Sequence, residues 1–330
     1  MAMISTTEEQ IKVAKMSRDR VLRNFALTDI VFHNVSKAAA IFVLLLLGGV
    51  AISLIAGSWE ALTTFGIDFF TTQTWNPVKG IFGALAPIYG TLITSAIAMF
   101  IAVPVGLGIA IFLTELCPRS LRRPFGAAIE LLAGIPSIIY GLWGIFVFAP
   151  FLQTTLQPTM ISLFEHVPVM NSLFAGPPYG IGILTAAFVL VIMVLPFITS
   201  ISRDVFETVP PVLKESAYGI GCTTWEVVYN IVLPYTRAGL VGGIMLGLGR
   251  ALGETMAVTF VIGNAHDIKA SLFAPGTTIS ASIANEFTEA VEPIYTSSLM
   301  ELGLILFVIT FIVLALARYM LMRLEASKGK

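Results

Sequence analysis

The chain has 330 residues, of which 56% are hydrophobic and 12% are charged, and its formal net charge is −1. A soluble domain usually carries roughly 25% charged residues, so this composition excludes a soluble globular enzyme and a disordered chain. The near-neutral charge and the lack of a basic block exclude a nucleic-acid-binding protein. Two Cys exclude a disulfide scaffold. What remains is an integral membrane protein.

Residues 1–36 precede the first long apolar run, and hydrophobic side chains recur among their Lys and Arg residues at helical spacing. This pattern predicts an amphipathic helix in the inner headgroup layer of the membrane. A solvated helix is the alternative interpretation. We therefore assign 1–36 as an N-terminal cytoplasmic or interfacial segment that contacts lipid, 37–320 as the transmembrane domain and 321–330 as a cytoplasmic tail.

Six segments are long and apolar enough to cross the membrane, since about 20 apolar residues are needed. They predict an all-α protein with six transmembrane helices, at residues 37–57, 87–113, 127–151, 180–201, 238–263 and 299–320.

Lys and Arg are distributed unevenly between the two ends of these helices. Sixteen of the nineteen fall before the first span, after the second, between the fourth and fifth, or at the end of the sixth. Only Lys79 and Lys269 lie on the other side, and Arg250 lies within the fifth span. By the positive-inside rule, the sixteen-residue side is cytoplasmic. Both termini are then cytoplasmic.

The cytoplasmic loop 203–236 is predicted to form two short helices. Thr208 to Pro211 is a natural helix start, and Gly219 and Gly221 should end that helix. Thr223 or Thr224 should cap a second helix, which Leu233-Pro234 should end before the fifth span.

This loop carries a family resemblance. It is similar to the loop Glu-Ala-Ala, three residues, Gly, nine residues, Ile-x-Leu-Pro of the inner-membrane permeases of ABC importers, with Ser in place of the first Ala. The matching residues are Glu215, Ser216, Ala217, Gly221, Ile231, Leu233 and Pro234. The resemblance implies that this loop forms the coupling helices that sit in a groove of a separate ATPase.

The resemblance extends from about residue 37 to the end of the chain. Segments 89–95, 134–141, 247–257 and 300–307 are similar to the permease subunits of phosphate importers. This implies a MetI-like permease fold and the import of inorganic phosphate into bacteria through the cytoplasmic membrane. It also implies three partners: a second homologous permease chain, an ATPase dimer that binds ATP and Mg²⁺, and a periplasmic or extracellular phosphate-binding protein.

The chain shows no catalytic motif of its own. A Walker A loop needs Gly-x-x-x-x-Gly-Lys-Ser/Thr, and the only Gly-Lys pair is Gly329-Lys330. There is no His-Glu-x-x-His zinc motif, and we expect no cofactor, metal or catalytic residue. Energy should come from the ATPase partner.

Two charged residues, Arg250 and Glu254, lie near the middle of the predicted fifth span. Charges there face a protein interior or a water-filled path, and residues four apart share one helix face. We predict that Arg250 lines an anion path, because its planar guanidinium can form two parallel N–H bonds to phosphate oxygens. We also predict that Glu254 pairs with Arg250 when no anion occupies the path. The alternative is an ion pair that only joins helices.

Two further residues are weaker candidates for the path. Pro136 breaks the third span, so Ser137 could contribute its hydroxyl to an anion site, although a packed kink explains it as well. Thr255 could supply another donor, or could bond within the helices. Glu301, near the outer end of the sixth span, is expected to reach the interface.

Three other functions remain open on the residues alone. A permease for sulfate or molybdate would have the same architecture. A proton-coupled secondary transporter could use Arg250 and Glu254 but leaves the coupling loop unexplained. A membrane scaffold or sensor would not need its charges inside the membrane.

Overall fold

The computed structural model describes residues 2–326; the side chains of residues 2–27, 168 and 324–326 lie outside that description. The regular secondary structure of the described chain is helical, with irregular segments between the helices and two isolated backbone bridges. Six stretches are long and apolar enough to span a membrane, which confirms the predicted number. They are Thr28–Gly57, Leu85–Leu116, Ser137–Phe164, Ile183–Glu207, Thr224–Leu252 and Pro293–Arg323.

The chain divides into two compact units, residues 1–56 and residues 57–330. The first consists of α1 (Ala2–Gly57), one helix without a break near residue 36. The assignment of 1–36 as an interfacial segment stays a prediction, because most of its side chains lie outside the described part.

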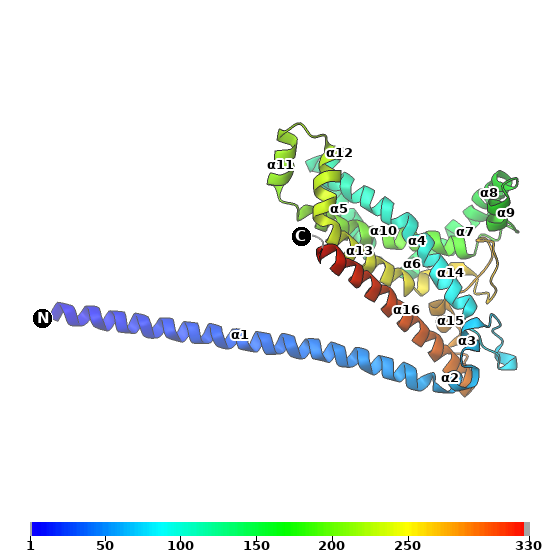
Figure 1. Ribbon diagram of the computed structural model, residues 1–330, viewed down its shortest axis with the longest axis horizontal. Coiled ribbons are helices and arrows are strands. Elements are labelled where there is room, and N and C mark those ends of the chain that lie inside the picture. Colours follow the sequence, from blue (N-terminus) through cyan, green and yellow to red (C-terminus); the bar gives the residue numbers. More distant parts are fainter. Residues whose placement is uncertain (1, 327–330) are drawn as a thin grey trace. The chain divides into compact units, whose positions relative to one another are not determined.

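The second unit holds the other five spans and the short helices that join them (Figure 1). The longer helices are α4 (Leu85–Ile111), α5 (Arg119–Ala133), α10 (Ile183–Glu207), α13 (Leu233–Leu252) and α16 (Pro293–Ala326). The shorter helices are α2 (Trp59–Phe65), α3 (Asp68–Thr71), α6 (Ser137–Trp143), α7 (Ala149–Phe151), α8 (Gln157–Phe164), α9 (Pro168–Phe174), α11 (Pro211–Gly219), α12 (Thr224–Val227), α14 (Met256–Ile262) and α15 (Ile279–Glu286). One 3₁₀ turn, η1 (Pro77–Lys79), and the π-helical turns η2 (Phe112–Leu116), η3 (Gly144–Phe148), η4 (Leu152–Leu156) and η5 (Val228–Val232) complete the unit.

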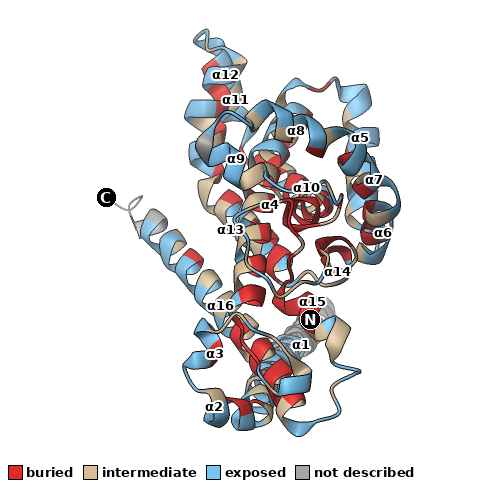
Figure 2. Cartoon of the chain, turned by 90° about the vertical axis from the view of Figure 1, so that its right-hand side faces the viewer, coloured by how far each residue is buried: buried red, intermediate tan, exposed pale blue. Residues whose placement is uncertain are grey.

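Helix α10 forms the centre of this unit. Its apolar residues surround the whole helix, so it is buried on most sides, as the red ribbon in Figure 2 shows. Small residues on α4, such as Ala98 and Ala102, are fully buried against it. At Gly106 an added Cβ would lie 3.0 Å from Ile198 of α10. Small side chains therefore allow these helices to approach closely.

The predicted bounds of the third and fifth spans were wrong. The predicted span 127–151 is interrupted at Gly134–Pro136, where Pro136 has an extended backbone, so α5 ends and the spanning helix begins at Ser137. The predicted span 238–263 is interrupted at residues 253–255 and begins at Thr224 instead of residue 238. Apolar length alone does not reveal such breaks.

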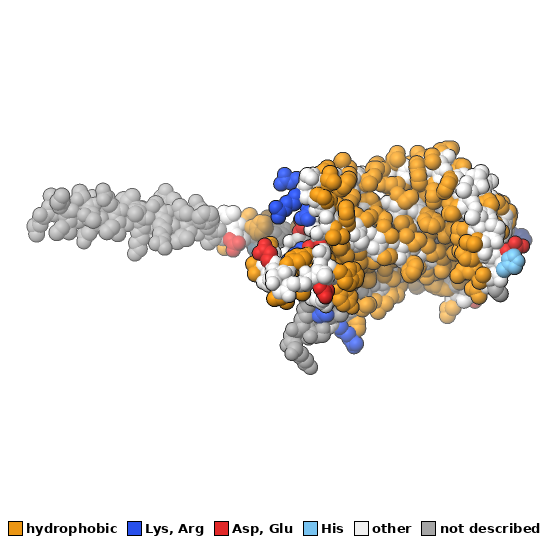
Figure 3. Space-filling view, turned by 90° about the horizontal axis from the view of Figure 1, so that it is seen from above, with side chains coloured by type: hydrophobic (Ala, Val, Ile, Leu, Met, Phe, Trp, Pro, Cys, Tyr) orange, Lys and Arg blue, Asp and Glu red, His pale blue; other side chains and the backbone are white. Residues whose placement is uncertain are grey.

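The short helices gather at two opposite ends of the second unit (Figure 1). One end carries α11, α12 and the start of α5, and the other carries α2, α3, α8 and α9. Most of the visible Lys and Arg side chains lie toward the first end in Figure 3, while hydrophobic side chains cover the middle.

Candidate functional site

Arg250 lies in the last turn of α13, directly before the break in the fifth span. Its side chain is exposed on the surface of this chain, and its Cζ lies 5.7 Å from the ring centroid of Phe197 on α10. Within the described part of the chain, no carboxylate lies within 4.0 Å of it. A contact through the face of the guanidinium leaves its N–H edge available to another group.

The prediction that Glu254 and Arg250 share a helix face was wrong. Residues 253–255 are not helical, and Glu254 Oε1 instead accepts a hydrogen bond from the backbone N–H of Ala257, at 3.2 Å. Glu254 thus bonds to the first turn of α14. The break in the helix explains why four-residue spacing does not place the two charges together.

Ser137 and Thr255 begin two helices that pack against each other. Ser137 is the first residue of α6 and Thr255 immediately precedes α14. An added Cβ at Gly141 of α6 would lie 3.0 Å from the backbone oxygen of Met256 in α14. Both side chains are half-buried, and Thr255 Oγ1 donates to the backbone oxygen of Gly253 at 3.3 Å.

Two residues near Arg250 had not been singled out from the sequence. Phe197 faces the guanidinium of Arg250. The positive charge of this guanidinium also interacts electrostatically with the hydroxyl of Tyr140. Tyr140 also donates to the backbone oxygen of Leu132 at 2.8 Å, which ties α6 to the end of α5 across the Pro136 break. A sequence pattern gives no sign of these contacts, because they join separate helices.

The loop 203–236 forms two short helices, as predicted. Helix α11 ends at Gly219, and Gly221 follows with φ +94°, a conformation that favours glycine. Thr223 and Glu226 then form a reciprocal capping box at the start of α12. The predicted helix end at Leu233-Pro234 was wrong: η5 continues into α13, and Thr236 Oγ1 donates to the backbone oxygen of Val232 at 2.6 Å.

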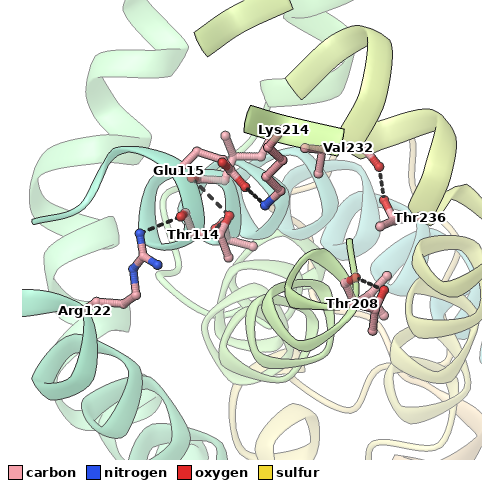
Figure 4. A network of polar contacts seen from close by, with 10 residues as sticks. Thr114, Glu115, Arg122, Thr208, Lys214, Val232 and Thr236 are labelled. Atoms are coloured by element: carbon pink, nitrogen blue, oxygen red, sulfur yellow. Dashed lines mark hydrogen bonds and ion pairs between the residues drawn. The ribbon is translucent and has the colours of Figure 1, made fainter. Parts of the chain in front are cut away.

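A polar network fixes the base of these short helices (Figure 4). Lys214 Nζ of α11 lies 2.5 Å from Glu115 Oε1, which belongs to the turn that ends the second span. Arg122 donates to the backbone oxygen of Thr114, in the same turn, at 2.6 Å. The side chain of Glu115 is only 6% exposed. Helix α11 is therefore attached to the second span rather than free in solution.

The loop residues that match the permease pattern divide into two groups. Ala217, Ile231 and Leu233 pack into a core with Phe206 and Val227. The others are exposed, namely Glu215, Ser216, Gly221 and Pro234. The first group holds the fold, and the second is available to a partner.

An exposed apolar surface on α11, α12 and the residues that directly follow each of them had been missed from the sequence. Ile220 is 83% exposed and Trp225 68%. Val212 and Tyr229 are exposed as well, and the rings of Trp225 and Tyr229 stack with centroids 6.1 Å apart. Large apolar side chains exposed together mark a contact surface.

The opposite end of the unit holds a half-buried polar cluster. Trp75 Nε1 and the hydroxyl of Tyr295 donate to Glu286 Oε2 at 2.6 and 2.7 Å. His266 stacks on Trp75, with centroids 5.1 Å apart, and its Nε2 lies 3.6 Å from Glu286 Oε1. Burial lowers the pKa of His266 to about 4 and raises the pKa of Glu286. Within the described residues, His, Cys, Asp and Glu form no group of three that could hold a metal.

A family model described as "Binding-protein-dependent transport system inner membrane component" matches residues 102–326, which include every residue of the loop 203–236. The chain belongs to this family. It is therefore a permease component of a binding-protein-dependent transport system, and both the non-catalytic assignment and the membrane assignment agree with that family.

The curated relatives are similar over nearly the whole chain. "Phosphate transport system permease protein PstC" of Mesorhizobium japonicum is 71% identical over 99% of this chain and 100% of that protein. The protein with the same name from Pasteurella multocida is 57% identical over 93% of this chain and 96% of that protein. This family member is thus similar to phosphate permeases over all six spans.

Solved structures share the fold. The inward-facing MetNI methionine ABC transporter matches with a TM-score of 0.56 at 16% identity, over 76% of this chain and 99% of that chain. A bacterial ABC transporter involved in alginate import matches with a TM-score of 0.57 at 18% identity, over 82% of this chain and 88% of that chain. The predicted MetI-like permease fold is confirmed.

Proposed function

We propose that this permease subunit imports inorganic phosphate by alternating access, driven by a separate ATPase. The proposal is supported by the names of its relatives and by one feature of the site: an arginine in a spanning helix with no carboxylate partner among the described residues. A second permease chain would form the other half of the path.

Arg250 is the residue that would meet the anion. A buried phosphate needs dense donors to replace its lost hydration, and guanidinium provides two parallel N–H bonds to its oxygens. Phe197 holds the guanidinium weakly, since a cation–π contact is worth about 0.5–2 kcal/mol. An anion could therefore engage Arg250 without first breaking an ion pair. Ser137 and Thr255 begin neighbouring helices and would supply further donors.

The exposed surface of α11 and α12 would dock on the ATPase dimer, which would bind the ATP and Mg²⁺. The stacked rings of Trp225 and Tyr229 would fill apolar space there. Glu115 and Lys214 would transmit movement of α11 to the second span, because their ion pair is largely buried. In this proposal both termini lie in the cytoplasm, and the end of the second unit that carries α2, α3, α8 and α9 faces the binding protein.

The test is uptake of labelled phosphate into vesicles that contain this chain, the second permease and the ATPase dimer, with binding protein outside and ATP inside. We expect Arg250→Ala to lower uptake by about tenfold or more, since losing a charged contact commonly costs over 1.4 kcal/mol. Arg250→Lys should lose part of the uptake activity, because lysine lacks the planar guanidinium that can form two parallel N–H bonds. Arg318→Ala, which removes an exposed arginine near the end of α16, is the matched control.

The results also separate the other functions. Preferential uptake of sulfate or molybdate would favour another oxyanion, and uptake without ATP would favour a proton-coupled transporter. Wild-type uptake by Arg250→Ala would contradict the role of Arg250 while leaving the family assignment intact.

A further inference from the structure

The ring of Phe197 on α10 lies outside the apolar core of the chain. Its neighbours Leu195 and Ile198 pack into the cluster that surrounds α10, whereas Phe197 joins none of the three apolar clusters in the described part of the chain. Its side chain is half-buried, and the Cζ of Arg250 lies 5.7 Å from its ring centroid. An aromatic ring that the core does not use therefore faces the arginine of the proposed anion path.

Two glycines allow α13 to lie close to α10. An added Cβ at Gly243 would lie 2.5 Å from the side chain of Ile201, and one at Gly247 would lie 3.0 Å from that of Ile198. Only small residues permit such an approach. Residue numbers rise along α13 as they fall along α10, so the two helices are antiparallel. These contacts fix the register in which the next turn of α13 meets α10.

This register sets Arg250 against Phe197. Arg250 follows Gly247 by three residues, nearly one turn of α13, and Phe197 directly precedes Ile198 on α10. Helix α10 is the most buried of the six described spans, whereas α13 ends two residues after Arg250, at the break before α14. The ring therefore belongs to a firmly packed helix, and the arginine lies at the end of its own helix.

The ring favours one orientation of the arginine side chain. An arginine has many rotamers of similar energy, so any one orientation is a minority unless a neighbour stabilises it. A cation–π contact stabilises the orientation in which the guanidinium lies over the ring. The N–H groups lie in the guanidinium plane and remain available to two oxygens of an anion. The ring thus selects an orientation without occupying the donors.

We propose that Phe197 is a positioning residue for Arg250: the face of its ring holds the guanidinium in the orientation in which the transported anion meets it. This inference rests on the proposed role of Arg250 in phosphate import. A carboxylate would hold the arginine more strongly, but it would compete with the anion for the same N–H groups. A neutral ring does not compete, and it contributes no donor of its own.

Fluorinated phenylalanines at position 197 test the ring face, because each fluorine withdraws electron density from the ring and nearly preserves its shape. The assay is uptake of labelled phosphate into vesicles that contain this chain, the second permease and the ATPase dimer, at saturating loaded binding protein. We expect the uptake rate to fall stepwise through the mono-, di- and trifluoro residues, by about fivefold in all. Equal rates across the series would overturn the proposal, because a ring that only packs would tolerate fluorine.

Two controls separate positioning from packing. The same fluorinated residues at Phe260, a half-buried ring of α14 that packs on the apolar core, should leave the uptake rate unchanged. In an Arg250→Ala background, fluorination at position 197 should have no further effect, because the ring then has no guanidinium to hold. A loss of equal size with and without Arg250 would show that Phe197 acts through packing, and the proposal would be wrong.

Ordinary substitutions provide a second test. Phe197→Tyr keeps the ring face and should retain most of the uptake, whereas Phe197→Leu keeps only apolar volume and should lose about fivefold. The reverse order would contradict the proposal. Wild-type uptake by Arg250→Ala would overturn the roles of both residues. Reduced uptake by Arg250→Ala, together with equal rates across the fluorinated series, would overturn the role of Phe197 alone.

Discussion

At the residue scale, the hydrogen bond between Glu254 and Ala257 replaces the ion pair expected with Arg250. Glu254→Ala should lower the free energy of unfolding by about 1–2 kcal/mol, because a backbone N–H in the first turn of α14 loses its acceptor. Glu254→Gln should lose less, since its amide oxygen can accept the same bond. Thermal unfolding of the purified chain, followed by fluorescence, measures the difference.

Arg250 provides the control for that measurement. If an ion pair stabilised this region, Arg250→Ala would destabilise the chain as much as Glu254→Ala does. The structure predicts a smaller loss, limited to the contact with Phe197. Equal losses from the two substitutions would contradict the helix-start role of Glu254.

His266 should make the stability of the chain depend on pH. Its pKa is about 4 in the folded chain and about 6.5 when unfolded. Between these values only the unfolded chain binds the proton, so stability should fall by up to about 3 kcal/mol as the pH drops from 6.5 to 4. Glu286 acts in the opposite direction, because its pKa is raised by burial and its contribution is lost as the pH rises.

Comparing the wild type with His266→Gln isolates the histidine, since Glu286 is present in both proteins. The melting temperature of the variant, relative to that of the wild type, should rise steadily as the pH falls from 6.5 to 4. A constant difference across this range would mean that His266 is not held neutral by burial.

At the element scale, the close packing of α4 depends on particular glycines. A Cβ at Gly90 would lie 1.8 Å from the backbone oxygen of Thr277, whereas a Cβ at Gly108 on the same helix would meet nothing within 4 Å. Gly90→Ala should therefore destabilise the chain by about 1–3 kcal/mol through overpacking. Gly108→Ala should be neutral or stabilise it by up to about 1 kcal/mol, since alanine favours helix.

Apparent melting temperatures of the two variants, measured in the same detergent, test this contrast. If both substitutions shift the melting temperature equally, the loop around Thr277 is not packed against α4 as the structure describes.

The elements also show what could be predicted from the sequence. Local signals were sufficient for α11 and α12, because Gly219, Gly221 and Thr223 act on neighbouring residues. The number of spans followed from apolar length. A break at Pro136 was one of two interpretations of that residue, beside a packed kink, and the break at Gly253 was not predicted, because a helix can also continue through Pro or Gly within a membrane.

The site was predicted less completely than the fold, for a related reason. Arg250 was identified because a charge within a span is unusual, yet its neighbour Phe197 belongs to another helix. The contact of Lys214 with Glu115 joins residues about 100 positions apart. Glu301 was expected at the interface, but it is buried, because α16 packs against α2 and α4. Pairings of this kind follow from tertiary packing, and no spacing rule reveals them.

At the scale of the whole molecule, the two ends of the second unit should face opposite sides of the membrane. Helix α4 and the turn after it, Leu85–Leu116, cross the membrane once, between Lys79 in η1 and Ser120 at the start of α5. Both residues are exposed. Since Lys and Arg favour the cytoplasmic side, the end near Ser120 should be cytoplasmic and the end near Lys79 should face outward.

Single cysteines test this orientation in a background with Cys117→Ala and Cys222→Ala. In right-side-out vesicles, a membrane-impermeant maleimide should label Lys79→Cys and leave Ser120→Cys unlabelled, and inside-out vesicles should show the reverse. In permeabilised vesicles the maleimide should label both positions, which shows that both cysteines can react. Labelling of both positions from one side of sealed vesicles would contradict a single crossing by Leu85–Leu116. A reversed pattern would keep that crossing but invert the topology, and α11 and α12 could then not reach an ATPase in the cytoplasm.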